Sequence, residues 1–438
     1  MLNQVENKEK DVSRFFIFSL FFTAILLHQS NVVFGVNISF ADFFCGLLLI
    51  FLVTNRRFLI PIGPLVFFFM ISILALVSAN LYIPIKFAIA SEPIRIISDF
   101  TKLMAIFIYF LIGYNLAKLH LVTLTIRWYS MFGYLVGMIG ILFTLLNIRI
   151  LSDLLFFADT RFKGLMIDPN YFSVLQITAL VYMTRSETIK LPYKFIAVII
   201  TLFSVLSTGS KTGMITLFGY FVFRILEYLF LKKKNLPAVV AQFVLGGLLV
   251  LGLALFYDFV QQVLTNLAGR IPSFSRVYLL FSDFGAAISE GGSGREDTWK
   301  AAFQVIQVSP VFGIGVGTYT TISWKMFAYD NVAHNTFLQI TAEWGIPMAF
   351  FFIIYVIYLL ATATNSRHVP STVNIIIRDM VIILLMGSMA ISLNNARILW
   401  LLLGALFFLH ENKCVTLNEF QLLEFGGNDD KRNSRFYP

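Results

Sequence analysis

The sequence predicts an all-α integral membrane protein with about a dozen transmembrane helices and one long extracytoplasmic loop that contains amphipathic helices. Of its 438 residues, 58% are hydrophobic and only 13% are charged, and the mean hydropathy is +0.81. A soluble domain has roughly 45–50% apolar and about 25% charged residues, so no water-soluble fold of this length could bury so much apolar surface. Long apolar runs supply the helices, and one polar interval supplies the loop.

Apolar runs divide the chain from end to end. A helix that spans a bilayer needs about 20 mostly apolar residues. Runs near that length occur at 15–33, 38–54, 62–80, 100–117, 129–147, 170–184, 194–208, 213–231, 237–257, 337–361, 376–394 and 397–410. The first run lacks a small-residue cleavage site, so we expect a retained helix and not a removed signal peptide.

Lysines and arginines in the short loops indicate the orientation, because they concentrate on the cytoplasmic side. With the N-terminus inside, the inner loops contain Arg56, Arg57, Lys118, Arg127, Arg185, Lys190, Lys194, Lys232, Lys233, Lys234, Arg367 and Arg378. We therefore place both termini in the cytoplasm. The net charge of +9 comes from such scattered residues, which argues against nucleic-acid binding.

This organisation gives four parts. They are about nine transmembrane helices in 1–257, an extracytoplasmic helical loop in 258–336, about three transmembrane helices in 337–410, and a cytoplasmic tail in 411–438.

The long loop reads as an ordered cap on the outer membrane surface. Apolar residues recur at helical spacing in 295–308, and 258–271 and 274–289 also read as amphipathic helices. Ser293 and Glu296 form a capping-box pattern, which places a helix start here. The alternative, an unstructured spacer, needs no such signal.

Polar and basic residues gather at the outer ends of the apolar runs, where ionisable groups usually mark function. Clustered Arg and Lys side chains imply an anionic ligand, and a diphosphate suits them best. We assign to diphosphate binding Arg295, Lys211, Arg161 and Arg397. We assign to substrate binding Asn335, Lys163 and Arg276.

Two of these cations lie at predicted helix starts. At the start of its helix, Arg295 is reinforced by free N–H groups and the positive helix end, although it could be an ordinary surface arginine. Lys211 lies in Ser-Thr-Gly-Ser-Lys-Thr-Gly, which departs from the phosphate-loop pattern because Ser210 replaces the required Gly. A lysine that snorkels to the interface is the alternative.

His334 directly precedes an apolar helix, where a neutral imidazole could act as a general base or hydrogen-bond a ligand. A structural histidine is the alternative. Glu343 lies on the opposite side of a straight helix, so we expect no His–Glu dyad; Asn335, Gln339 and Glu343 share a face.

Other motifs indicate little chemistry. Gly313-Ile-Gly-Val-Gly317 follows no βαβ strand, so we interpret it as a tight turn and not as a dinucleotide site. Metal-ligand spacing is lacking, and Cys45 and Cys414 form no disulfide framework. We therefore expect no metal and no cofactor.

The ordered motifs resemble those of the O-antigen ligase/polymerase family. They are Gly294-Arg295-Glu-Asp-Thr-Trp299, Pro310-Val-Phe-Gly-Ile-Gly-Val-Gly317, Ala333-His334-Asn-Thr-Phe-Leu338, Glu343-Trp-Gly-Ile-Pro347, Thr208-Gly-Ser-Lys-Thr-Gly213, Arg161-Phe-Lys-Gly164 and Asp168-Pro-Asn-Tyr171.

The resemblance implies a metal-independent glycosyltransferase on the outer face of the bacterial plasma membrane, which takes a glycan from undecaprenyl diphosphate. By position, Arg295 holds the diphosphate and His334 orients or deprotonates the acceptor hydroxyl; these two are the expected catalytic residues. Lys211 stands where the family often has Arg, and it lacks the bidentate fork. A single displacement would invert the anomeric centre.

Polymerase and ligase share these motifs. We favour a polymerase that joins repeat units into O-antigen, capsule or exopolysaccharide; a ligase that passes the glycan to lipid A core is the alternative. A lipid-linked glycan transporter is a second alternative, which the lack of paired broken helices disfavours. The implied partners are the lipid-linked donor, the acceptor, membrane lipids, a flippase and a chain-length regulator.

Overall fold

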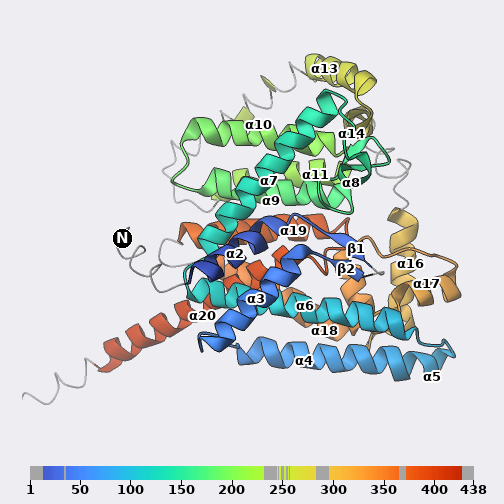
Figure 1. Cartoon of the computed structure of the whole chain (residues 1–438), viewed down its shortest axis with the longest axis vertical. Helices are drawn as coiled ribbons and strands as arrows, with labels where there is room; N and C mark the ends of the chain where they lie inside the picture. The colour runs from blue at the N-terminus through green and yellow to red at the C-terminus, as the bar shows by residue number, and fades with distance from the viewer. Residues whose placement is uncertain are drawn as a thin grey trace, which may run out of the picture.

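The computed structural model describes residues 13–33, 36–230, 257–282, 295–364 and 371–426, with a few single positions between 244 and 255. These residues are mostly helical (Figure 1). The elements are α2 (Arg14–Leu26), β1 (Asn31–Val33), β2 (Val36–Ile38), α3 (Phe40–Thr54), α4 (Ile62–Val77), η1 (Ser78–Tyr82), α5 (Ile83–Phe87), α6 (Pro93–Lys118), α7 (Val122–Leu145), α8 (Ser152–Leu155), β3 (Phe156–Phe157), β4 (Arg161–Phe162), α9 (Pro169–Arg185), α10 (Leu191–Ser207), α11 (Lys211–Phe230), α13 (Tyr257–Arg270), α14 (Pro272–Ser282), α16 (Arg295–Val308), α17 (Tyr319–Phe327), α18 (Thr336–Thr364), α19 (Thr372–Ser388) and α20 (Arg397–Gly426).

The prediction of an all-α membrane protein is confirmed in outline. Two short antiparallel pairs, β1–β2 and β3–β4, are the strands found in the described part of the chain. Five helices there are long and apolar enough to cross a bilayer, and three shorter apolar helices, α2, α3 and α10, accompany them. The five are Ile62–Phe87, Pro93–Lys118, Val122–Leu145, Lys211–Leu229 and Thr336–Thr364.

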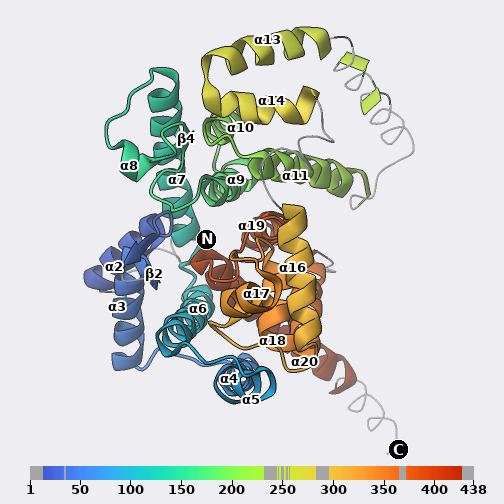
Figure 2. The same ribbon diagram turned by 90° about the vertical axis from the view of Figure 1, so that its right-hand side faces the viewer.

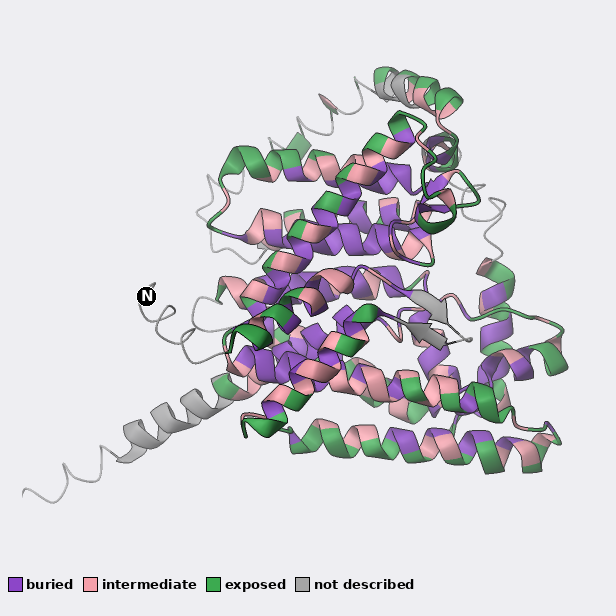
Figure 3. Cartoon of the chain, viewed as in Figure 1, coloured by how far each residue is buried: buried purple, intermediate pink, exposed green. Residues whose placement is uncertain are grey.

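Each predicted apolar run contains a helix except 237–257, which lies largely outside the described residues. The count of about twelve spans and the four-part division remain predictions. Large apolar side chains on the outward faces of the bundle are exposed: Phe69 of α4 is 63% exposed and Phe218 of α11 is 71% exposed. Contact with lipid explains this exposure. By contrast, α9 is buried over most of its length (Figure 3).

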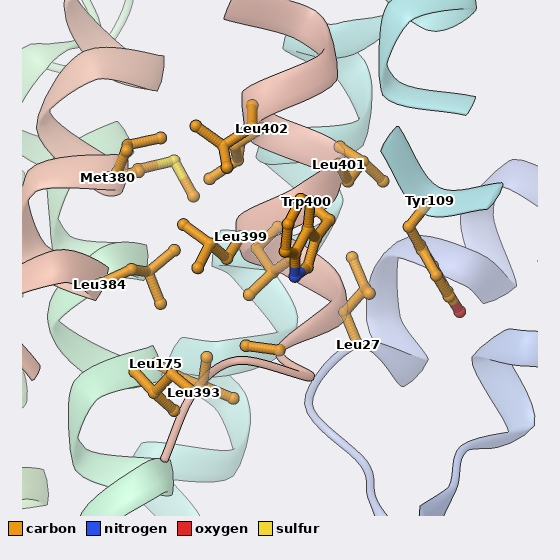
Figure 4. Close-up of a cluster of buried hydrophobic side chains, with 14 of the residues drawn as sticks. Leu27, Tyr109, Leu175, Met380, Leu384, Leu393, Leu399, Trp400, Leu401 and Leu402 are labelled. Carbon is orange, nitrogen blue, oxygen red and sulfur yellow. The ribbon is translucent and has the colours of Figure 1, made fainter. Parts of the chain in front are cut away.

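Most helices run side by side in two groups. In Figures 1 and 2, α7–α11, α13 and α14 form one group, and α2–α6 with α16–α20 form the other. The two groups meet where α19 packs on α9. The core lies around α20, where Leu399, Trp400 and Leu401 face neighbouring helices (Figure 4).

The closest crossing in that core joins α6 to α20, and it depends on two glycines. A Cβ on Gly113 would lie 1.9 Å from the carbonyl oxygen of Leu401, and a Cβ on Gly404 would lie 1.9 Å from that of Phe110. Small residues let two transmembrane backbones approach in this way.

The described parts of the predicted loop, 258–282 and 295–336, contain helices. The expected amphipathic segments correspond to α13, α14 and α16, and α17 is an addition that periodicity did not indicate. The buried face of α16 includes Ala302 and Val305, whereas Phe303 is 56% exposed. The capping residue Ser293 lies outside the described residues.

The glycine-rich segment between α16 and α17 is a turn, as predicted, but it is buried against α18. Gly313 and Gly315 have φ of +69° and +79°. Gly345 breaks the helical path of α18, and the freed carbonyls of Ala342 and Glu343 accept the N–H groups of Ile314 and Gly315 at 2.8 and 3.0 Å. The turn thereby satisfies backbone groups that the kink leaves open.

A buried ion network joins α9, α11 and α19, and it corrects one assignment. Arg378, expected in an inner loop, lies in α19 and is 2% exposed. It donates to Asp379 at 2.6 Å and to Glu227, and Arg185 donates to the same two carboxylates. These arginines and carboxylates join the three helices inside the bundle.

Candidate functional site

The N-termini of α9, α11, α16 and α18 lie at one end of the bundle, together with the β3–β4 turn. Hydrogen bonds link β4 to α9, α9 to the start of α11, and α11 to α16. Figure 2 views the molecule from this end. Helix N-termini carry partial positive charge and free N–H groups, so their meeting favours an anion.

The Asn170 side chain lies at the centre of a network of hydrogen bonds. Its Oδ1 accepts from Arg161 Nη2 at 3.0 Å and from Ser210 Oγ at 2.9 Å. Arg161 Nε also donates to the carbonyl oxygen of Thr208 at 2.9 Å. The turn at Gly209, with φ of +58°, passes so close to α14 that a Cβ would lie 2.9 Å from the carbonyl oxygen of Ser273. These contacts fix Arg161 beside the start of α11.

Arg161 is largely buried, and the surrounding charges are mainly positive. Burial, followed by the positive charges of Arg276 and Arg295, lowers the pKa of Arg161 to about 10, and Asp168 opposes part of this shift. The guanidinium is still charged at neutral pH. A buried cation with cationic neighbours is stabilised by a bound anion.

Arg295 occupies the first position of α16 and is tied to α11. Its Nη2 donates to Thr212 Oγ1 at 2.6 Å. Burial lowers the pKa of Arg295, and the Asp168 carboxylate partly restores it. Lys211, the first residue of α11, lies within electrostatic reach of Arg295 and Arg276. The predicted cations Arg161, Lys211, Arg276 and Arg295 therefore form one cluster, which we call the cation cluster.

Asp168 is the carboxylate that acts on this cluster. Its Oδ1 caps α9 by accepting from the N–H groups of Asn170 at 2.6 Å and Tyr171 at 3.1 Å. The same carboxylate raises the pKa of Arg161, Arg295 and His334. Asp168 thus lies near enough to join the histidine to the cations electrostatically.

His334 lies in the turn that leads into α18, with φ of +45°. Burial lowers its pKa below the usual 6.5; Asp168 opposes this shift and Arg295 adds to it. The imidazole is therefore neutral at neutral pH. A neutral imidazole beside a cationic site can accept a proton from a hydroxyl group.

Two residues that we assigned to ligand binding have other partners. Arg397 donates to Asp42 through Nε at 2.5 Å and through Nη2 at 2.6 Å, and Tyr109 donates to the same carboxylate at 3.0 Å. This arrangement ties α20 to α3 and α6. Asn335 caps α18, since its Oδ1 accepts from Phe337 N at 3.0 Å and its Nδ2 donates to the carbonyl oxygen of Met389 at 3.0 Å.

The remaining assigned residues lie at the edge of the site. Arg276 is an exposed residue of α14, and Lys163 is half-buried two residues beyond Arg161. The Lys163 side chain joins none of the hydrogen bonds described above. Sequence reasoning missed the supporting roles of Asn170, Ser210 and Thr212. The Asp-Pro-Asn sequence at the start of α9, a typical capping pattern, was the available signal.

Comparison with known proteins gives one finding for this region. Residues 196–353 match the model of the O-antigen ligase family. The matched interval contains Lys211, Arg276, Arg295 and His334, whereas Arg161 and Asp168 precede it. No curated protein matches the chain.

Proposed function

We propose that this multi-pass membrane protein, which matches the O-antigen ligase family over residues 196–353, polymerises glycan repeat units carried on undecaprenyl diphosphate. The products would be O-antigen, capsule or exopolysaccharide chains. The family supports a transfer enzyme of this type and gives no support to a transporter.

The observation that carries the proposal is the cation cluster beside a neutral histidine. A diphosphate needs several positive donors, and Arg161, Lys211 and Arg295 converge from β4, α11 and α16. Arginine pairs with phosphate oxygens through two parallel N–H donors, and lysine adds a point charge. We propose that these side chains, without a metal ion, neutralise the diphosphate.

The reaction then needs one proton transfer. His334 takes the proton of the acceptor hydroxyl while its oxygen attacks the anomeric carbon of the donor sugar. The bond from that carbon to the diphosphate oxygen breaks, and the electron pair leaves with the lipid diphosphate, whose charge the cation cluster stabilises. Because attack and departure occur on opposite faces, the anomeric configuration inverts.

The other assigned residues take separate roles. We propose that Arg276 and Lys163, at the edge of the site, contact the glycan. Arg397 pairs with Asp42 and Asn335 caps α18, so both have structural roles, and their assignment to ligand binding stays a prediction.

The proposed location follows from the charged loops. We place the protein in the bacterial inner membrane with both termini in the cytoplasm, and the site at the extracytoplasmic end of the bundle. The donor then reaches the site after a flippase has moved it across the membrane, and a chain-length regulator would act on the growing polymer.

A ligase that transfers the glycan to lipid A core is the second candidate, which the description of the matched family favours. A gel of surface glycans from a strain that lacks the protein distinguishes the two. Cores capped by a single repeat unit indicate a polymerase, whereas uncapped core with accumulated carrier-linked polymer indicates a ligase. Glycans that match the parent strain would refute both activities.

Two variants test the site in the same strain. His334→Ala and Arg295→Ala should both fail to restore the glycan pattern at near-normal abundance in the membrane. Normal glycans from both variants would refute the site.

A further inference from the structure

A pair of hydrogen bonds runs along one face of α18 toward His334. Gln339 Nε2 donates to Glu343 Oε1 at 2.5 Å, and Gln339 Oε1 accepts from the backbone N–H of Ala333 at 3.2 Å. The residues at 339 and 343 are one helical turn apart, so their side chains meet. Glu343 is thereby linked to the peptide that immediately precedes His334.

The backbone at His334 needs such support. Its φ of +45° lies in the left-handed region, which residues with a Cβ rarely adopt. On the C-terminal side, the turn is held by Asn335, which caps α18. On the N-terminal side, Ala333 is fully buried, and Gln339 accepts its N–H. The histidine is therefore fixed from both directions.

Glu343 and Ala333 together fix the orientation of the Gln339 amide. A glutamine amide has a donor end and an acceptor end of nearly equal size. Glu343 Oε1 accepts from Nε2, and the Ala333 N–H donates to Oε1, so the side chain is held at both ends. Without an acceptor at 343, only the Ala333 N–H holds the amide, and the support of the turn is weaker.

The position of Glu343 within the bundle is unusual for an ionisable residue that has no part in catalysis. It lies in a membrane-spanning helix, where ionisable side chains are costly and usually functional. The charged groups nearest to it are Asp99 and Lys102 of α6, which pair with each other at 2.7 Å, and Tyr319 of α17 also lies close. The Glu343 carbonyl, separately, is held by Gly315 N–H at 3.0 Å. The side chain is thus not needed to hold the kink.

We propose that Glu343 and Gln339 are positioning residues, which orient His334 toward the acceptor hydroxyl in the glycan transfer. This inference rests on the proposed function. It names the groups that set the geometry of the base and that neither the motif pattern nor the family match assigns.

The test uses the full-length purified protein and lipid-linked donor, with kcat, KM and the pH profile measured for three variants. Loss of an outer partner that orients a metal-ligating side chain typically costs about 10- to 100-fold, and we expect a similar range for a partner that orients a base. Glu343→Leu and Gln339→Leu should lower kcat by about that factor with donor KM changed less than about twofold. Glu343→Gln is the matched control: its amide oxygen still accepts from Gln339, so most activity should remain.

The pH profile separates positioning from general stability. His334 has a pKa below 6.5 because it is buried, with Asp168 and Arg295 as its charged neighbours. Glu343→Leu frees the turn and exposes the imidazole, so the pH at which kcat falls on the acid side (the acid limb) should rise toward 6.5. Glu343→Gln should leave that pH unchanged. Equal effects of Leu and Gln at 343, or unchanged kcat and acid limb in both leucine variants, would overturn the inference.

The His334→Ala variant keeps this test distinct from that of the proposed function. Full activity of His334→Ala refutes the role of the base itself. If His334→Ala is inactive while Glu343→Leu and Gln339→Leu are normal, the proposed function stands and the positioning role is wrong.

Discussion

Replacing Arg295 with alanine removes the cation that joins α16 to the rest of the site. Arg295 is half-buried, donates to Thr212 at 2.6 Å, and lies within electrostatic reach of Lys211, His334 and Asp168. The side chain makes no contribution to the hydrophobic core, so the fold should tolerate the change. The expected effect is therefore on transfer and not on abundance.

The magnitude follows from the charge that develops on the leaving group. Removing one preorganised donor from such a site costs about 10²–10³ in kcat, or about 2.7–4 kcal/mol. Three other members of the cation cluster remain, so we expect the lower end, about 100-fold. Arg295→Lys keeps the charge but loses the planar fork, and we expect a loss of about 10-fold, or about 1.4 kcal/mol.

The assay is transfer from a lipid-linked donor by purified protein, with Arg270→Ala as the matched control. Arg270 is an exposed arginine at the end of α13, in the same interval between α11 and α18. The control should retain at least half of the activity. A loss of less than threefold in Arg295→Ala, or equal losses in both alanine variants, would refute a role for Arg295 in stabilising the leaving group.

Three further outcomes are expected. Activity should persist as the pH falls through 6.5 and be lost only below it, because burial lowers the pKa of His334 and the neutral imidazole is the base. A kcat that already falls on the acid side at a pH above 6.5 would contradict this assignment. Asn170→Leu should lower kcat by about 10-fold, since Arg161 and Ser210 both lose their acceptor, and normal kinetics would show that the network is dispensable. Gly404→Ala should destabilise the protein by about 1–3 kcal/mol or more, because its Cβ would lie 1.9 Å from the carbonyl oxygen of Phe110. Gly46→Ala is the control, because open space surrounds Gly46 and the added methyl group should not destabilise the protein. Thermal unfolding of both variants in detergent measures the difference.

Hydropathy was enough to locate the helices, because lipid selects for apolar side chains along each span regardless of what the span packs against. Candidate site residues could be predicted from the sequence where they lie at the end of a helix, because a helix end can be recognised from neighbouring residues alone. Arg295, Lys211 and His334 were predicted in this way, and the structure places Lys211 and His334 each within electrostatic reach of Arg295. Their roles in binding and catalysis stay predictions.

Partners far apart in the chain could not be found in that way. Arg397 was taken for a ligand-binding cation, but it pairs with Asp42, 355 residues away in the sequence. Arg378 was taken for a loop residue, and its partner Glu227 is 151 residues away. The shared face of Gln339 and Glu343 was predictable from helical spacing. The hydrogen bond between Gln339 and Ala333 was not, because it depends on the left-handed turn at His334, which the sequence does not indicate.

Asp168 shows how the charge of the site distinguishes the leaving group from the substrate. The cation cluster carries four positive charges, and Asp168 removes one, which leaves three while His334 is neutral. A glycosyl lipid diphosphate carries about two negative charges, and the freed lipid diphosphate gains part of a third, because a terminal phosphate ionises with a second pKa of about 6. The site therefore interacts more strongly with the charge that develops on the departing diphosphate in the transition state than with the bound substrate, and this difference lowers the barrier.

Replacing Asp168 with asparagine tests this balance without removing the helix cap, since asparagine caps helices as well as aspartate. The extra positive charge should strengthen inhibition by free polyprenyl diphosphate by about 10-fold, which is the effect of one charge at about 12 Å and an effective dielectric of about 20. The loss of the carboxylate should also lower the pKa of His334 further, so the acid limb of kcat should move to lower pH. Ser152→Ala, in α8 before the β3–β4 turn, is the control. If inhibition and acid limb in Asp168→Asn both match those of the parent protein, Asp168 acts on α9 alone, and the charge of the site does not discriminate between substrate and leaving group.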